Sequence, residues 1–118
     1  MLSFAGALKV YLAVEPQDMR KNFNGLSALV SDHLQGDTSQ GALYVFTNRR
    51  RNRLKILYFD GTGLWLMTKR LEQGTFSWPQ TADAKQAVLR LKPEALAMLT
   101  DGVDMHRVTL RPWFERKN

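Results

Sequence analysis

The middle of the chain alternates short apolar runs with short polar segments. The apolar runs are rich in β-branched, aromatic and leucine residues, which favour β-strands. The polar segments contain asparagine, aspartate or glycine, as hairpin turns do. Because short connections join antiparallel neighbours, this pattern predicts a four-stranded antiparallel meander. The predicted strands cover residues 42–46, 54–59, 64–72 and 75–78.

Apolar residues at helical spacing precede these strands and predict the main helix. We expect it to run from about residue 18 to residue 34, with Asp18 as its N-terminal cap and Gly36 as a stop soon after its end. A single sheet needs cover on one face, and this helix is the obvious cover. The apolar stripe of the helix consists of Met19, Phe23, Leu26 and Val30.

The two ends of the chain add shorter elements. Residues 9–14 predict a strand, residues 87–91 are a candidate for a further strand, and Pro93 suits the first position of a short helix over residues 93–101, with Gly102 just past its end. The predicted fold class is therefore α+β: an antiparallel meander of about four to five strands, with the main helix covering a face.

Length and composition predict one domain. The chain has 118 residues, of which 44% are hydrophobic, enough for a single modest core over residues 1–118. The pattern assigns no element to the C-terminal tail, where Trp113 and Phe114 are expected to pack on the core.

The absence of cysteine and the character of the N-terminus narrow the class of protein. Without cysteine the chain has no disulfide, no thiolate metal ligand and no cysteine nucleophile. No basic segment precedes the first apolar residues, and these stop at Glu15, well short of a membrane span. We therefore expect a soluble cytoplasmic protein without membrane contacts.

The positive charge is concentrated in one segment. The chain carries a formal net charge of +6. Residues 48–70 contain seven basic residues and one acid, so this segment accounts for the whole excess. Such a concentration is typical of a surface that binds a polyanion, and the alternative is a solvated, arginine-rich turn.

The sequence NRRRNR (residues 48–53) connects two predicted strands, so its arginines are expected at a hairpin tip. Each arginine offers a planar fork that matches phosphate oxygens or guanine. Asn48 and Asn52 suit a turn and could also bond bases. The predicted nucleic-acid-binding residues of this segment are Arg49, Arg50, Arg51, Arg53, Lys55, Lys69 and Arg70.

A second, weaker indication comes from Arg20 and Lys21. They fall in the first turn of the predicted main helix, where the helix dipole disfavours cations. A phosphate bound at that N-terminus would reverse this preference. Alternatively, Glu15 and Asp18 neutralise the two cations locally.

Aromatic residues are interleaved with the basic ones. Exposed rings could stack on the bases of a single strand. In a domain with one sheet, however, most of them are expected to fill the core. The residues in question are Tyr44, Phe46, Tyr58, Phe59 and Trp65.

The sequence offers no catalytic set. His33 and His106 lack metal-ligand spacing, and the aspartates are scattered over turns and caps, with only Asp60 close to the basic segment. The sequence DGTG (residues 60–63) is interpreted as a hairpin turn, because neither Lys-Ser/Thr nor a helix follows it. We therefore expect no enzyme, cofactor or metal site, and a metal-dependent nuclease is disfavoured.

Three stretches share order and spacing with a known family. They read DMRKNFNGLSALV, GALYVFTNRRRNRLKILYFDGTGLWLMTKRLEQGTFSWP and, more loosely, LKPEALAMLTDGVD, and they span about Val10 to Asp104. In these stretches the chain resembles the short TnpB-type accessory proteins, which are encoded by the second reading frame of bacterial insertion sequences of the insertion-sequence-66 type.

The resemblance implies a mobile-element protein that assists transposition beside a separate, large transposase, which performs the strand chemistry. It carries over no catalytic residue. Together with the charge pattern, it leads us to expect a non-catalytic, nucleoid-associated accessory protein of DNA transposition that binds DNA through the basic hairpin. The alternative is a protein adaptor that docks the transposase through the same hairpin without direct DNA binding.

Overall fold

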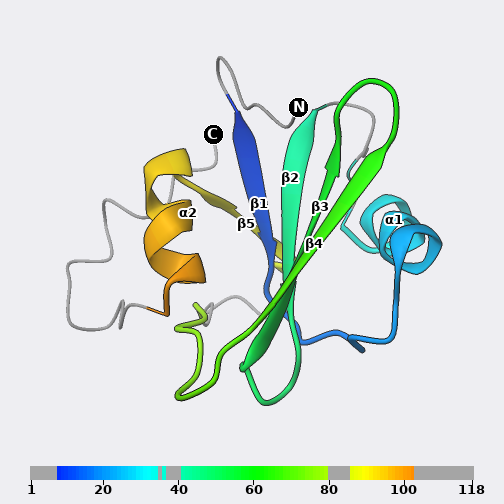
Figure 1. Ribbon diagram of the computed structural model, residues 1–118. Helices are drawn as coiled ribbons and strands as arrows, with labels where there is room; N and C mark the ends of the chain where they lie inside the picture. The colour runs from blue at the N-terminus through cyan, green and yellow to red at the C-terminus, as the bar shows by residue number, and fades with distance from the viewer. Residues whose placement is uncertain (1–7, 35, 37–40, 80–85, 103–118) are drawn as a thin grey trace.

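The computed structural model describes residues 8–34, 36, 41–79 and 86–102, and Figure 1 shows their arrangement. The fold is α+β, as predicted, and the described residues form one open sheet and two helices. In chain order the elements are β1 (Lys9–Ala13), α1 (Phe23–Asp32), β2 (Ala42–Thr47), β3 (Arg53–Phe59), β4 (Leu64–Arg70), β5 (Val88–Leu91) and α2 (Pro93–Thr100).

The sheet has the strand order β4-β3-β2-β1-β5. Strands β2, β3 and β4 form the predicted antiparallel meander with short turns. β1 pairs with β2 in parallel, with α1 as the crossover between them, and β5 adds antiparallel to the other side of β1. The C-terminal ends of β1 and β2 therefore lie at the same end of the sheet.

The predicted strand at residues 75–78 is wrong. This segment has no regular secondary structure, and it buries Phe76 and Trp78 almost completely. The Trp78 indole donates a hydrogen bond to the carbonyl oxygen of Ala13 at 2.9 Å. Burial of the aromatic rings, rather than strand pairing, explains the strand-like composition. The candidate strand near residues 87–91 is confirmed as β5.

The main helix is shorter than predicted, because it begins at Phe23 and not at Asp18. The Asp18 carboxylate accepts a hydrogen bond from the Arg20 backbone N–H at 2.9 Å, which holds a turn ahead of the helix. Arg20 and Lys21 therefore precede α1, and their placement in its first turn is wrong. Phe23 is 45% exposed, and the buried face of α1 consists of Leu26, Leu29 and Val30.

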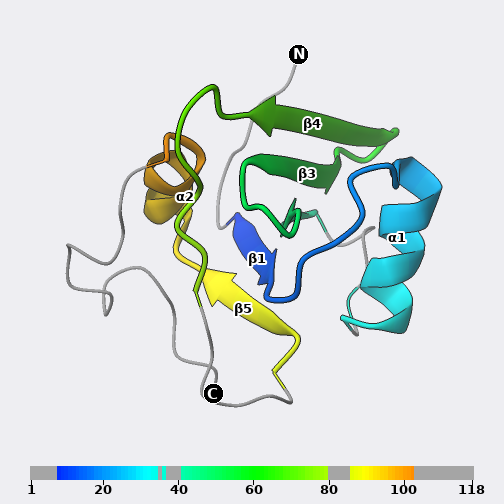
Figure 2. The same cartoon turned by 90° about the horizontal axis from the view of Figure 1, so that it is seen from below.

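Both faces of the sheet are covered, whereas the sequence predicted cover only for one. Figures 1 and 2 show α1 on one side of the sheet and α2 on the other. We call these sides the α1 face and the α2 face. The core of the α1 face includes Leu26, Val30, Tyr44, Phe46 and Leu57. The core of the α2 face includes Val10, Leu12, Val45, Ile56, Phe76, Trp78 and Leu99.

The short second helix follows its prediction closely. Pro93 occupies its first turn, and Gly102 adopts φ of 78° just past its end. Within the described ranges, no helix is long and apolar enough to span a membrane. The predictions for His106, Trp113 and Phe114 fall outside the described residues.

Candidate nucleic-acid interface

The hairpin tip between β2 and β3 is held by its own asparagines. The Asn48 side-chain oxygen accepts hydrogen bonds from the backbone N–H groups of Asn52 and Arg53, both at 3.1 Å. The Asn48 amide donates to the Asn52 side-chain oxygen at 2.7 Å. Both asparagines therefore act as turn formers, because both side-chain groups of Asn48 and the side-chain oxygen of Asn52 are bonded within the turn.

The tip is also attached to the segment that follows β4. The carbonyl oxygen of Arg51 accepts a hydrogen bond from the Phe76 N–H at 2.6 Å, and that of Asn52 accepts one from the Leu71 N–H at 2.9 Å. Because Phe76 is buried in the core, these bonds fix the tip relative to the sheet. The arginines thus project from a rigid support.

A second segment lies beside the tip. The backbone N–H of Gln17, in the loop between β1 and α1, donates to the carbonyl oxygen of Thr47 at 2.7 Å. Between this loop and the tip is an open groove of about 360 Å³, which we call the arginine groove. It is lined by Gln17, Asp18, Met19, Asn48, Arg49, Arg50, Asn52 and Arg53.

Arg20 adds a further guanidinium beside the groove. Its side chain is 92% exposed and pairs with the groove residue Asp18, with the closest contact at 2.7 Å. Hydrogen bonds from the Arg20 side chain, followed by the bond from its backbone N–H, lower the pKa of Asp18 to about 2. Asp18 is therefore charged at neutral pH and offsets the charge of Arg20.

Within the part of the chain that the structure describes, the arginines of the tip have no such acidic partner. Among the described residues, no ion pair is found for Arg49, Arg50, Arg51 or Arg53. Arg53 also lies directly opposite Arg70 on β4, and like charges in this position destabilise a sheet. Arg70 has a loose contact with Glu72 at 3.6 Å. A bound anion would remove this repulsion.

Three of the predicted site residues, Lys55, Lys69 and Lys21, lie away from the arginine groove. Lys55 is only 8% exposed, and its ammonium donates to the carbonyl oxygen of Lys21 at 2.7 Å and to the Asn22 side chain at 3.2 Å, so it anchors the start of α1. Lys69 contacts Asp101 at 3.8 Å on the α2 face. Burial and the strand alternation thus separate these lysines from the arginine groove.

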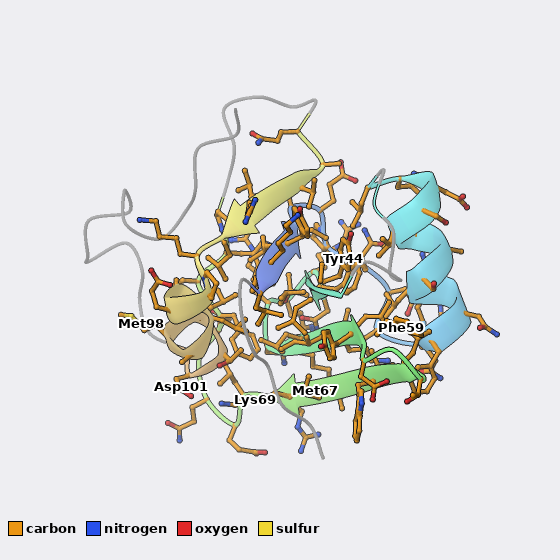
Figure 3. All side chains as sticks on the ribbon, turned by 90° about the horizontal axis from the view of Figure 1, so that it is seen from above. Tyr44, Phe59, Met67, Lys69, Met98 and Asp101 are labelled. Carbon is orange, nitrogen blue, oxygen red and sulfur yellow. The ribbon has the colours of Figure 1, made fainter. Side chains whose placement is uncertain are left out.

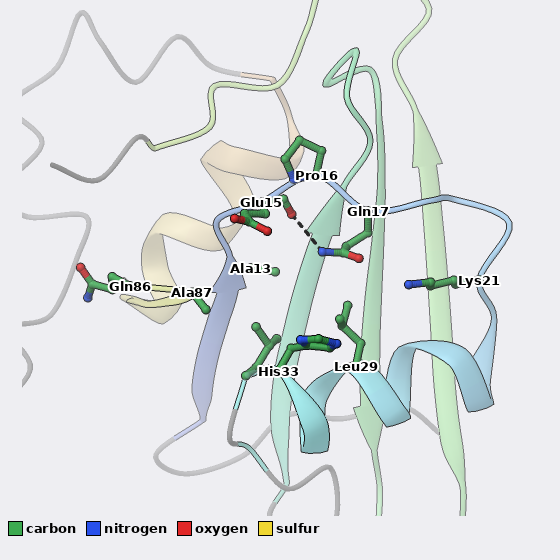
Figure 4. Close-up of a pocket in the computed structure, with 10 residues that line it drawn as sticks. Ala13, Glu15, Pro16, Gln17, Lys21, Leu29, His33, Gln86 and Ala87 are labelled. Carbon is green, nitrogen blue, oxygen red and sulfur yellow. Dashed lines mark hydrogen bonds between the residues drawn. The ribbon is translucent and has the colours of Figure 1, made fainter. Parts of the chain in front are cut away.

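Lys21 lines a different hollow, of about 350 Å³, beside α1 (Figure 4). In this hollow the side chains of Leu29 on α1 and of His33, the residue after α1, project toward Gln17. Of the nine predicted residues, the structure therefore gathers around the tip only Arg20, Arg49, Arg50, Arg51, Arg53 and, across the strand pair, Arg70.

The turn at residues 60–63 is a hairpin turn, as predicted. One oxygen of the Asp60 carboxylate accepts hydrogen bonds from the N–H groups of Thr62 and Gly63, at 2.8 and 2.9 Å. These bonds, together with one from the Trp65 indole, hold the pKa of Asp60 well below its usual range. In the described part of the chain, no three His, Asp or Glu side chains gather where they could share a metal ion.

Comparison with known proteins gives the family. The family model described as IS66 Orf2-like protein matches residues 8–110 of this chain. The chain belongs to the IS66 Orf2-like family. This confirms the resemblance to accessory proteins of insertion sequences of this type. Membership of the IS66 Orf2-like family indicates an accessory role in transposition, and the family is not a known catalytic one.

Two relatives come from Sinorhizobium fredii (strain NBRC 101917 / NGR234). "Uncharacterized protein y4jC" is 38% identical over 112 residues, which cover 95% of this chain and 93% of that protein. "Uncharacterized protein y4hO" is 35% identical over 104 residues, which cover 88% of each chain. No solved structure matches the chain significantly.

Proposed function

We propose that this IS66 Orf2-like protein is a non-catalytic accessory factor of transposition that binds the phosphate backbone of DNA through its arginine hairpin. The observation that carries the proposal is the rigid tip, whose arginines lie beside the arginine groove and lack acidic partners among the described residues. Arginine is suited to this role because its planar fork bonds phosphate oxygens bidentately.

The cost of placing these charges together supports the same proposal. Arg53 and Arg70 face each other across β3 and β4, and Arg49 and Arg50 are exposed close by. Such an arrangement is unfavourable in the free protein and becomes favourable when phosphates neutralise the guanidinium groups. The main-chain bonds of the tip supply the rigidity that a fixed set of phosphate contacts requires.

The salt dependence of binding to a short DNA duplex tests the proposal. Log affinity falls as log salt concentration rises, and each phosphate contact steepens this slope by about 0.9. If Arg49 and Arg50 each neutralise one phosphate, the variant Arg49→Gln/Arg50→Gln should make the slope shallower by about 1.8. The control Lys9→Gln/Lys92→Gln removes the same charge from β1 and from the residue preceding α2, and it should leave the slope nearly unchanged.

Two results would contradict the proposal. An unchanged slope in the arginine variant would show that the tip does not contact DNA. Absence of binding by the unaltered protein, even at low salt, would reject DNA as the ligand. In the latter case, binding of the same hairpin to the purified transposase of the element, lost in the arginine variant, would favour the adaptor function instead.

A further inference from the structure

The outer edge of β4 presents backbone groups that the proposed DNA contact, made by side chains such as that of Arg70, does not use. β4 and β5 are the two edge strands of the sheet, as Figure 2 shows. β5 has only four residues, whereas β4 has seven. A short edge strand offers little to a partner, but a regular edge of seven residues is a template for pairing with another strand.

Alternate residues of β4 turn backbone groups toward this edge, where no described residue pairs with them. The N–H of Leu71 bonds Asn52, the residue that precedes β3, so the backbone groups of Lys69, Met67 and Trp65 also face β3. The intervening residues face outward, and no described strand pairs with them. These outward-facing residues are Leu64, Leu66, Thr68 and Arg70.

An ordered tryptophan lies beside the free edge. The Trp65 side chain is 42% exposed, yet its indole N–H donates to the Asp60 carboxylate at 2.7 Å. Asp60 is itself fixed by the turn that it closes. Tryptophan is enriched among residues that dominate binding energies, and a ring that is already ordered loses little freedom on association.

We propose that two copies of this protein pair β4 to β4 in an antiparallel manner, about a two-fold axis at Met67. In this register Leu64 lies opposite the partner's Arg70, and Leu66 lies opposite the partner's Thr68. Every outward-facing residue of β4 then gains a backbone partner. A shift of two residues in either direction would leave one end of each strand unpaired.

The side chains favour the same register. Trp65 lies opposite the partner's Lys69, and both are on the α2 face, so the ammonium can sit over the indole ring. The carboxylate of Asp60, bonded to that indole, adds a negative charge nearby. Figure 3 labels Met67 and Lys69 along β4, with Asp101 at the end of α2. No two like charges face each other across this pairing.

Site-specific disulfide formation tests the register, because the chain contains no natural cysteine. At the axis, Met67 and its copy form a pair that exchanges no backbone bonds, with Cα atoms about 4.5 Å apart, which suits a disulfide. Mild oxidation of Met67→Cys should therefore yield a covalent dimer. The control Trp65→Cys lies on the same face but opposite the partner's Lys69, so it should remain uncross-linked.

Sedimentation of the full chain without nucleic acid tests the pairing itself. We expect a concentration-dependent dimer, lost in Thr68→Pro, which removes an outward N–H that β3 does not use. Lys69→Glu should also abolish the dimer, because it places a carboxylate against the partner's Asp60 and Trp65. Lys9→Glu, with the same charge change on β1, should preserve the dimer. Circular dichroism establishes that each variant is folded.

Three outcomes would overturn the proposal. One is an unaltered protein that stays monomeric at every concentration, which would mean that Lys69 and Arg70 protect the edge instead of pairing it. Another is a dimer that survives both Thr68→Pro and Lys69→Glu. The third is equal cross-linking of Met67→Cys and Trp65→Cys. None of these results depends on DNA binding.

Discussion

Arg51 adopts a backbone conformation that suits glycine or asparagine better than arginine. Its φ of 58° lies in the left-handed region, and its carbonyl oxygen accepts the 2.6 Å bond from Phe76 that fixes the tip. For a residue with a β-carbon this conformation costs about 1–2 kcal/mol. Strain of this kind concentrates at functional sites, so the presence of arginine here supports a role for its charge.

Substitution of Arg51 separates its charge from its strain. Arg51→Gly should raise the free energy of unfolding by about 1 kcal/mol, because glycine relieves the left-handed conformation. Arg51→Ala retains the strain and should not stabilise the protein. Both variants should weaken duplex binding equally. Chemical denaturation and DNA titration measure the two effects, and full DNA affinity in Arg51→Gly would exclude Arg51 from the interface.

At the scale of elements, the loop between β1 and α1 adds a negative charge to the arginine groove. Asp18 belongs to the groove, and its carboxylate accepts three hydrogen bonds from the Arg20 side chain. This exposed pair contributes little to stability. Its larger effect is electrostatic, because a carboxylate beside the tip repels phosphate and occupies the guanidinium of Arg20.

Removal of the Asp18 charge should therefore strengthen DNA binding. In Asp18→Asn, Arg20 becomes available for one more phosphate. The slope of log affinity against log salt concentration should therefore become steeper by up to about 0.9. Glu94→Gln removes the same charge on α2, across the sheet from α1, and should leave the salt dependence unchanged. Equal slopes for Asp18→Asn and the unaltered protein would place Arg20 outside the DNA contact.

At the scale of the whole molecule, the segment after β4 connects the hairpin tip to the core. Phe76 bonds the tip through its backbone N–H, and Trp78, two residues later, bonds the carbonyl oxygen of Ala13 on β1. Both aromatic side chains are buried on the α2 face. The position of the tip is thus tied to the packing of strands that are distant in the sequence.

Trp78→Phe tests the importance of this connection. It should lower the free energy of unfolding by about 1–3 kcal/mol, because it leaves the carbonyl oxygen of Ala13 without its buried donor. Trp65→Phe removes the same indole donor at an exposed position and should cost less. Denaturant unfolding at low protein concentration compares the two, and equal losses would contradict a special structural role for Trp78.

Local sequence signals predicted the parts of the fold that depend on chain neighbours. The two hairpins joining β2, β3 and β4 were readable because their turns are short and rich in asparagine, aspartate and glycine. The start of α1 was not readable, because the Asp18 carboxylate, which was expected to cap the helix, instead accepts the Arg20 backbone N–H in a turn ahead of it. Residues 75–78 were misassigned because aromatic residues that pack without a strand have the same composition as a strand.

The sequence by itself determined the α+β class, the family and the concentration of charge in one hairpin, because each depends on residue types and their local spacing. Tertiary structure alone decided which cations share a surface. The parallel pairing of β1 with β2 brings Asp18 and Arg20 to the tip, whereas burial takes Lys55 away from it. Such choices depend on contacts between residues far apart in the chain, and these contacts leave no local pattern.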